Sequence, residues 1–315
     1  RNILQINGLS TIFDLFSGHY ITDSGNNKGN PLMSEKTFPR TNVAGIDMPR
    51  MIAGTNWLLG YSHTGGVADK MIRERHSTPQ SMADVFKAFL EEGVDAAMAP
   101  FSTNPLALEA IKLAEDQAGK KIIIVDSPPI NVDDSPEARA IAKKQIKKSK
   151  EIGSTFCLIH QGSAEQLVNK NLRAMPRLPD YLEMIREEGL IPGLSAHMPE
   201  LVTYSDANGY DVQTYIQIFN CLGFLMQVEV ESVYKIIRSA KKPVMTIKPM
   251  AAGRTTPFIG LTFNFSVLRD CDMVTCGCLT PDEAREDVEI ARAAIERRQP
   301  FIEARSSPAK TEIIK

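Results

Sequence analysis

The sequence lacks the features of a secreted, membrane-bound or nucleic-acid-binding protein. Its five cysteines are an odd number, and a chain of 315 residues is too large to need disulfide staples, which favours a reducing compartment. No apolar run reaches the length of about 18 residues that a membrane-spanning helix needs. The formal net charge of −2 leaves no basic footprint for nucleic acid. We therefore expect a cytoplasmic protein that acts on small molecules, without nucleic-acid or membrane partners, and homo-oligomerisation stays open.

Two of the cysteines, Cys276 and Cys278, are separated by a single residue. This spacing lacks the two-residue gap of redox and zinc-binding pairs, and the chain has no matching second pair. We interpret them as small packing residues, with metal binding as the alternative.

The ends of the chain differ from its middle in composition. Residues 24–30 form a polar, linker-like run that follows an interrupted apolar stretch. We expect 1–32 to be a partly disordered N-terminal extension, 33–300 to form one folded domain, and 301–315 to be a C-terminal tail.

From residue 51 onward, short apolar runs alternate with longer amphipathic segments, which is the pattern of parallel strands joined by helices. Glycines end several of the predicted helices, and one helix is predicted over 211–222. The eight predicted strands are 51–56, 94–99, 122–126, 155–160, 190–197, 224–229, 243–248 and 272–276. Their number and the chain length match a closed (β/α)8 barrel, with an open doubly wound sheet as the alternative.

Ionisable residues end five consecutive predicted strands. Barrel enzymes place their reacting groups at the C-terminal ends of strands and in the loops that follow. Each of these residues alone has a structural explanation, but five of them converging on one mouth favour an active site. The candidate catalytic residues are Asp126, His160, His197, Glu229 and Lys248.

The alternation of side chains along a strand predicts which of these residues face the barrel interior. His160 is predicted to point inward. Lys248 is predicted to point inward, with Met245 and Ile247 facing the helices. In the sixth predicted strand, Gln227 and Glu229 are predicted to share the inward side.

A lysine beside a low-dielectric barrel wall loses its proton more easily and becomes a nucleophile for carbonyl groups. We take Lys248 as the candidate for a Schiff base, with His160, His197 or Asp126 moving protons. This chemistry would support aldol cleavage, dehydration or isomerisation.

The same strand ends also allow a metal mechanism. His160, His197 and Glu229 supply nitrogen and oxygen ligands for a divalent metal, which would polarise a carbonyl group as a Lewis acid. In that version Lys248 is an electrostatic clamp.

Further polar residues near the predicted strand ends are candidates for substrate binding. The loops after the seventh and eighth strands, where barrels often hold phosphate, contain Arg254 and Gly277. We expect a small, anionic, oxygenated substrate, with Asn56, His63, Gln227, Arg254 and Gly277 as its binding residues.

Four stretches of the sequence, 93–97, 156–161, 247–253 and 280–288, resemble the aldo-keto reductases, which are (β/α)8 barrels that use NADP. That family's chemistry uses an Asp, a Tyr, a Lys and a His. His160 matches the histidine, whereas Met98 stands where the family has Asp and Asp126 where it has Lys, and no tyrosine lies in 101–105.

Three hypotheses for function follow. The leading one is a barrel enzyme of lyase or isomerase type, similar to aldolases. The resemblance implies an NADP-linked oxidoreductase as an alternative. A non-catalytic ligand-binding barrel is the third.

Overall fold

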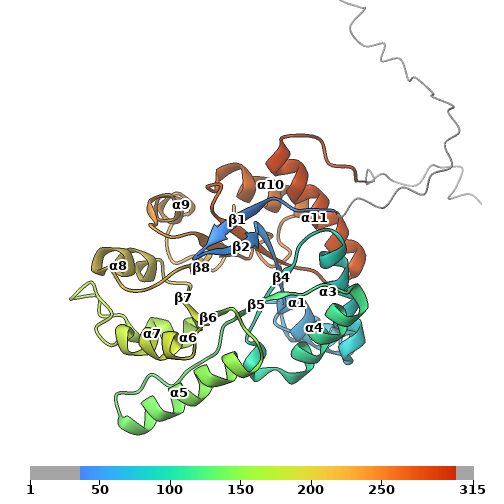
Figure 1. Cartoon of the computed structure of the whole chain (residues 1–315). Coiled ribbons are helices and arrows are strands. Elements are labelled where there is room, and N and C mark those ends of the chain that lie inside the picture. Colours follow the sequence, from blue (N-terminus) through green and yellow to red (C-terminus); the bar gives the residue numbers. More distant parts are fainter. Residues whose placement is uncertain (1–35, 303–315) are drawn as a thin grey trace, which may run out of the picture. The chain divides into compact units, whose positions relative to one another are not determined.

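A computed structural model of the chain describes residues 36–302 (Figure 1). The predicted extension 1–32 lies outside the described residues, and so does most of the predicted tail 301–315. None of the helices in residues 36–302 combines the length and apolar character that crossing a membrane requires.

Eight parallel strands form a closed barrel, as the alternating pattern predicts. In ring order they are β3 (Met51–Gly54), β4 (Ala96–Ala99), β5 (Ile123–Asp126), β6 (Phe156–Ile159), β7 (Ile191–Ala196), β8 (Tyr215–Ile218), β9 (Val244–Ile247) and β10 (Met273–Gly277). The ring closes where β10 pairs with β3, with Val274 opposite Met51. Closure excludes the open doubly wound sheet.

A short hairpin precedes the barrel. Strands β1 (Arg40–Val43) and β2 (Ile46–Pro49) pair antiparallel around Ala44 and Gly45, whose φ angles of 52° and 90° make the tight turn. Val43 and Met48 pack into the apolar cluster inside the barrel, which also holds side chains of the barrel strands. The hairpin therefore covers one end of the ring, in front of the strands in Figure 1.

Helices surround the ring and follow its strands. The longer ones are α3 (Pro79–Glu91), α4 (Pro105–Ala118), α5 (Pro136–Glu151), α7 (Leu178–Glu187), α8 (Glu200–Asn208), α9 (Val230–Ser239), α10 (Pro257–Val267) and α11 (Pro281–Glu296). Several begin with proline after a capping side chain, as at Ser135 and Thr280, because the missing proline N–H is not needed there.

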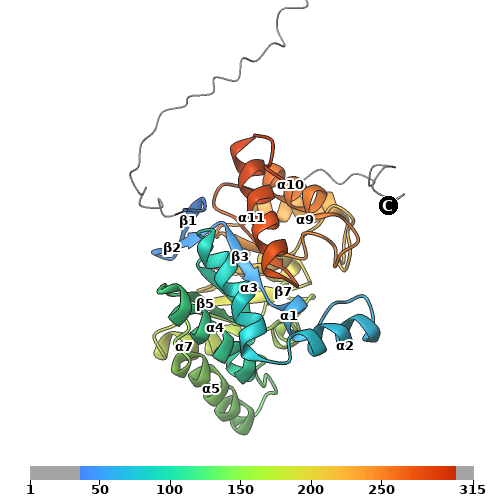
Figure 2. The same cartoon turned by 90° about the vertical axis from the view of Figure 1, so that its right-hand side faces the viewer.

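Further helical segments occupy the loops at the C-terminal ends of the strands. They are α1 (Asn56–Leu59), α2 (Gly66–Arg75), α6 (Gln161–Ala164), η1 (Phe101–Thr103) and η2 (Glu165–Leu167). Figure 2 shows α2 standing out from the barrel beside α1. The segment that follows β3 is therefore helical and extends away from the barrel.

The predicted sixth strand is wrong. The structure has α8 at Glu200–Asn208 and β8 at Tyr215–Ile218, within the segment predicted to be the helix 211–222, and residues 219–229 form the loop that follows β8. The left-handed Gly209 (φ 67°) ends α8, and the β-branched and aromatic residues after it favour a strand. Asp211, interpreted as a helix cap, instead forms an ion pair with Arg186.

The predicted orientation of β9 is also wrong, whereas that of β6 is confirmed. Met245 belongs to the cluster inside the barrel and Ile247 packs against it. Lys248 follows the last strand residue with a φ of 60°, so the alternation of the strand no longer applies to its side chain. In β6 Leu158 lies inside the barrel, as predicted.

Gly193 in β7 lies where neighbouring strands come close. A Cβ atom at this position would lie 2.5 Å from Cγ of Leu158 and 2.8 Å from the backbone oxygen of Thr214. We expect Gly193→Ala to lower the free energy of unfolding in urea by about 1–3 kcal/mol, the usual cost of overpacking. Gly66→Ala is the matched control, because nothing lies within 4 Å of its added Cβ. Equal stability losses in the two variants would contradict this prediction.

Candidate active site

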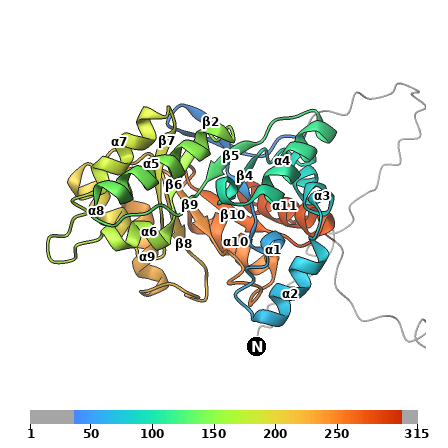
Figure 3. The same ribbon diagram turned by 90° about the horizontal axis from the view of Figure 1, so that it is seen from below.

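A cavity of about 380 Å³ opens at the C-terminal end of the barrel. Figure 3 shows the loops that surround this end, with α1 and α2 beside β10. Residues of several strands and of the loops that follow them line the cavity, among them Gly54, His160, Ser195, Lys248 and Thr275. The location agrees with the place where barrel enzymes assemble their reacting groups.

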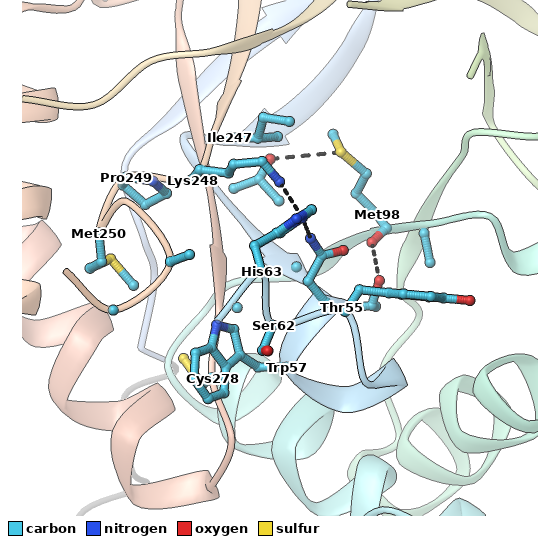
Figure 4. Close-up of a pocket in the computed structure, with 18 of the residues that line it drawn as sticks. Thr55, Trp57, Ser62, His63, Met98, Ile247, Lys248, Pro249, Met250 and Cys278 are labelled. Atoms are coloured by element: carbon cyan, nitrogen blue, oxygen red, sulfur yellow. Dashed lines mark hydrogen bonds between the residues drawn. The ribbon is translucent and has the colours of Figure 1, made fainter. Parts of the chain in front are cut away.

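Lys248 contacts His63 inside this cavity (Figure 4). Its Nζ lies 2.8 Å from Nε2 of His63, and that nitrogen lies 3.4 Å from Nδ2 of Asn56. Burial lowers the pKa of Lys248 to about 8. Among residues 36–302 no carboxylate forms an ion pair with the amine, so nothing nearby restores the charged form.

His63 is held by the loop between α1 and α2. It has a left-handed backbone (φ 56°), and the preceding Ser62 donates both its backbone N–H and its hydroxyl to Oδ1 of Asp69, at 2.8 and 2.5 Å. Burial, followed by the charge of Lys248, lowers the pKa of His63. A neutral imidazole can accept the proton of the adjacent amine through Nε2.

Two further histidines follow neighbouring strands. His160 lines the cavity after β6, and its Nδ1 accepts a hydrogen bond from the backbone N–H of Gly162. Burial lowers the pKa of His160. Burial, followed by the charges of Lys248, His160 and His63, lowers the pKa of His197, after β7, to about 4. His63 and His160 therefore provide neutral nitrogen bases in the wall of the cavity that holds the amine, whereas His197 is not one of the residues that line it.

The depressed pKa of His197 predicts a pH-dependent stability. The unfolded chain binds the proton near pH 6.5 and the folded one only near pH 4, so this contribution is present above pH 6.5 and is lost as pH falls toward 4. We expect a loss on the order of 2 kcal/mol, discounted for partial exposure. His197→Gln should lose less stability than the wild type between pH 7 and pH 4.5 in urea denaturation. Equal losses would contradict the prediction.

Asp126 does not reach the cavity. It ends β5 as predicted, but its neighbour Val125 faces the barrel interior, so Asp126 faces the helices. Its Oδ2 accepts a bond of 2.5 Å from the hydroxyl of Ser149, and its Oδ1 accepts one of 3.2 Å from the backbone N–H of Ser102. Burial raises the pKa of Asp126. These contacts tie β5 to its surrounding helices.

Glu229 and Gln227 are also not at a strand end. Both are exposed in the loop after β8, where Glu229 directly precedes α9. The structure therefore does not bring the predicted metal ligands His160, His197 and Glu229 together. Among residues 36–302, the side chains with the spacing of a metal site are those of Cys276, Cys278 and Asp287. The polar residue in β8 is instead Gln217, which donates to the backbone oxygen of His197.

Some of the predicted substrate-binding residues line the cavity and others do not. Asn56, His63 and Gly277 line the cavity. Arg254 lies at its side, with its guanidinium 3.8 Å from the centre of the Phe224 ring and 3.5 Å from the backbone oxygen of His63. The loop after β9 thus contacts the loop that holds His63.

The cavity is also lined by apolar and sulfur-containing residues, which the pattern of polar strand ends does not predict. Trp57, the single tryptophan of the chain, follows Asn56 in α1 and lines the cavity with Met98 and Met250. Its position directly after a predicted strand was the available signal. Trp57 also supplies a fluorescence reporter for ligands that enter the cavity.

Comparison with known proteins supports the fold. No protein-family model and no curated protein matches the sequence. A solved structure of a putative aldo-keto reductase from Pseudomonas aeruginosa is similar, with a TM-score of 0.57 and 15% identity over 84% of this chain and 100% of that one. Aldose reductase from Giardia lamblia has a TM-score of 0.51 and 10% identity, over 80% of this chain and 94% of that one. The resemblance to aldo-keto reductases is thus confirmed at the level of the barrel.

Proposed function

We propose that this protein is a barrel enzyme of lyase or isomerase type in which Lys248 forms a Schiff base with a small carbonyl compound. The observation that carries the proposal is the half-buried Lys248 amine, which lines the cavity, lies 2.8 Å from His63 and has no carboxylate partner among the described residues. A structural lysine is usually paired with an acid.

The lowered pKa makes Lys248 a nucleophile near neutral pH. At a pKa of about 8, about one-tenth of the amine is uncharged at pH 7, against about one in 2,500 for an ordinary lysine. Only the uncharged form carries the electron pair that attacks a carbonyl carbon. The surroundings of Lys248 therefore raise the fraction of its amine that is uncharged and reactive at neutral pH.

The surrounding imidazoles can move the protons that this chemistry requires. Attack by Nζ forms a C–N bond, and the amine proton passes to Nε2 of His63, which it already contacts. The carbonyl oxygen takes up two protons, the amine proton passed on by His63 and a second proton from solvent, and leaves as water, which gives the protonated imine. The imine withdraws electrons and favours cleavage of a neighbouring C–H or C–C bond, with His160 placed in the cavity wall to accept a proton.

The cavity favours a small anionic substrate. Its volume of about 380 Å³ limits the size of the ligand. The protonated imine on Lys248 would carry positive charge in the cavity, and Arg254, whose guanidinium lies 3.5 Å from the backbone oxygen of His63, adds positive charge in the loop after β9, where barrels often hold phosphate.

The test is reductive trapping. The full-length protein is incubated separately with pyruvate, dihydroxyacetone phosphate and glyceraldehyde 3-phosphate, reduced with borohydride, and analysed by intact and peptide mass spectrometry. We expect one of these compounds to add a single adduct at Lys248. Adducts distributed evenly over surface lysines, including the exposed Lys112 of α4, would overturn the proposal.

An NADP-linked reductase is the second candidate, favoured by His160, which lines the cavity where the resemblance places the family's histidine. The cavity presents Met98 instead of the family's Asp. NADPH binding should quench the fluorescence of Trp57, and the absence of quenching at millimolar NADPH would eliminate this candidate. A non-catalytic binding barrel would show ligand-dependent quenching with no trapped adduct.

A further inference from the structure

A second group of reactive side chains lies between β10 and α11. Cys276 lies in β10, Cys278 follows the strand, and both side chains point toward Asp287 in the second turn of α11. The two sulfur atoms lie 3.2 and 3.3 Å from the same oxygen, Oδ2 of Asp287. The one-residue gap that argued against a metal in the sequence places both thiols on the same side, because side chains alternate along a strand.

The three ligand atoms have the spacing of a metal site. All of them lie within 4.8 Å of one another. With Zn–S near 2.3 Å and Zn–O near 2.0 Å, a sulfur and an oxygen on a tetrahedral zinc ion lie about 3.5 Å apart. The observed distances of 3.2 and 3.3 Å are close to this value, so a small shift of the side chains would admit the ion.

The charge around the group favours a cation. Asp287 is buried, and no lysine or arginine forms an ion pair with it in the described part of the chain. Glu283 and Glu286 lie close enough to add negative charge around this carboxylate. A bound cation would offset the cost of burying this carboxylate.

The group is also accessible. Cys278 and Asp287 belong to the wall of the cavity, and Figure 4 shows Cys278 next to Trp57. An ion can therefore enter through the cavity mouth, and a water molecule from the cavity can complete four-fold coordination. Three protein ligands and one open position are typical of zinc sites that face a substrate cavity.

We propose that Cys276, Cys278 and Asp287 form a binding site for one thiophilic divalent cation of the zinc type. Both thiols bind as thiolates, so each gives up its proton when the ion enters. Without an ion, the thiols donate hydrogen bonds to the carboxylate, which is the arrangement that the structure describes.

The experiment uses full-length protein that has been reduced and stripped with a chelator. We expect Co²⁺ to bind in a ratio of one ion per chain, with thiolate-to-cobalt charge-transfer absorption and quenching of Trp57 fluorescence. Zn²⁺ should displace the cobalt, and Zn²⁺ added to the metal-free protein should release about two protons per ion in a weakly buffered solution. Absence of the charge-transfer band at saturating Co²⁺ would overturn the proposal.

Variants assign the ligands. Cys276→Ser combined with Cys278→Ser should remove the charge-transfer band. Asp287→Asn, which keeps the side-chain shape, should weaken Co²⁺ binding at least about 100-fold and leave circular dichroism unchanged. Cys221→Ser is the matched control and should bind as the wild type does. Wild-type affinity in Asp287→Asn, or loss of the band in Cys221→Ser, would contradict the assignment, and Asp287→Asn decides if the double variant fails to fold.

Discussion

In the Lys248→Met variant, the rate of borohydride-dependent labelling at pH 7 is expected to fall at least about 300-fold. The reason is that a shift of the amine pKa from 10.5 to about 8 raises the uncharged fraction of the wild-type amine by about that factor. Methionine fills a similar volume, so the cavity keeps its shape while the nucleophile is removed. The rate is measured by intact mass spectrometry with the carbonyl compound that labels the wild type. Lys112→Met, which removes an exposed amine on α4, should label at the wild-type rate.

The pH dependence of the same reaction separates a reactive lysine from a merely accessible one. The amine must be uncharged to attack, so the wild-type rate should rise about tenfold per pH unit below pH 8 and level off above it. A rate that continues to rise toward pH 10 would indicate an ordinary lysine. Labelling that persists in Lys248→Met would place the nucleophile elsewhere.

Substitution of Asp272 is expected to cause the largest loss in the free energy of unfolding. It is fully buried before β10, and it accepts hydrogen bonds from the backbone N–H of Val244 and from the guanidinium of Arg269. Arg269 also donates to the backbone oxygens of Ala240 and Lys242. The pair therefore joins the segment leading into β9 to the segment leading into β10.

Asp272→Ala should lower the free energy of unfolding by about 3–5 kcal/mol, because it leaves the backbone N–H of Val244 and the partly buried guanidinium of Arg269 without their partner. For a domain of this size the melting temperature should fall by roughly 10 °C. Urea denaturation and calorimetry measure the two quantities. Asp270→Ala is the control, since Asp270 is exposed and forms an ion pair with Arg50 at 3.5 Å, and this variant should have the melting temperature of the wild type. Similar behaviour of the two variants would contradict the role of Asp272.

Seven of the eight barrel strands follow from local patterns in the sequence. Each is an apolar run next to a glycine, a proline or a capping residue, and these signals act over a few residues. The sequence pattern predicts a helix instead of β8 because Asp211 resembles a helix cap and the four residues of β8 are too short a run for periodicity to distinguish a strand from a helical segment. That error moved the predicted strand end from the region of Ile218 to Glu229.

The candidate site was found where strand ends were predicted correctly. His160 and Lys248 directly follow β6 and β9 and line the cavity, and His63 follows β3 in the loop beyond it. Asp126 was included because it ends a strand, but the inward side of β5 belongs to Val125. A strand end identifies the correct edge of the barrel without identifying the side that a residue faces.

The sequence by itself determined the order of strands and helices and most of the strand ends, because caps, turns and apolar periodicity are local properties of the chain. Tertiary structure alone decided which side chains meet. The left-handed backbone of Lys248 turns its amine into the cavity, and closure of the ring brings it to His63, 185 residues away in the chain. The approach of Cys276 and Cys278 to Asp287 likewise depends on how α11 packs against β10, which no local pattern encodes.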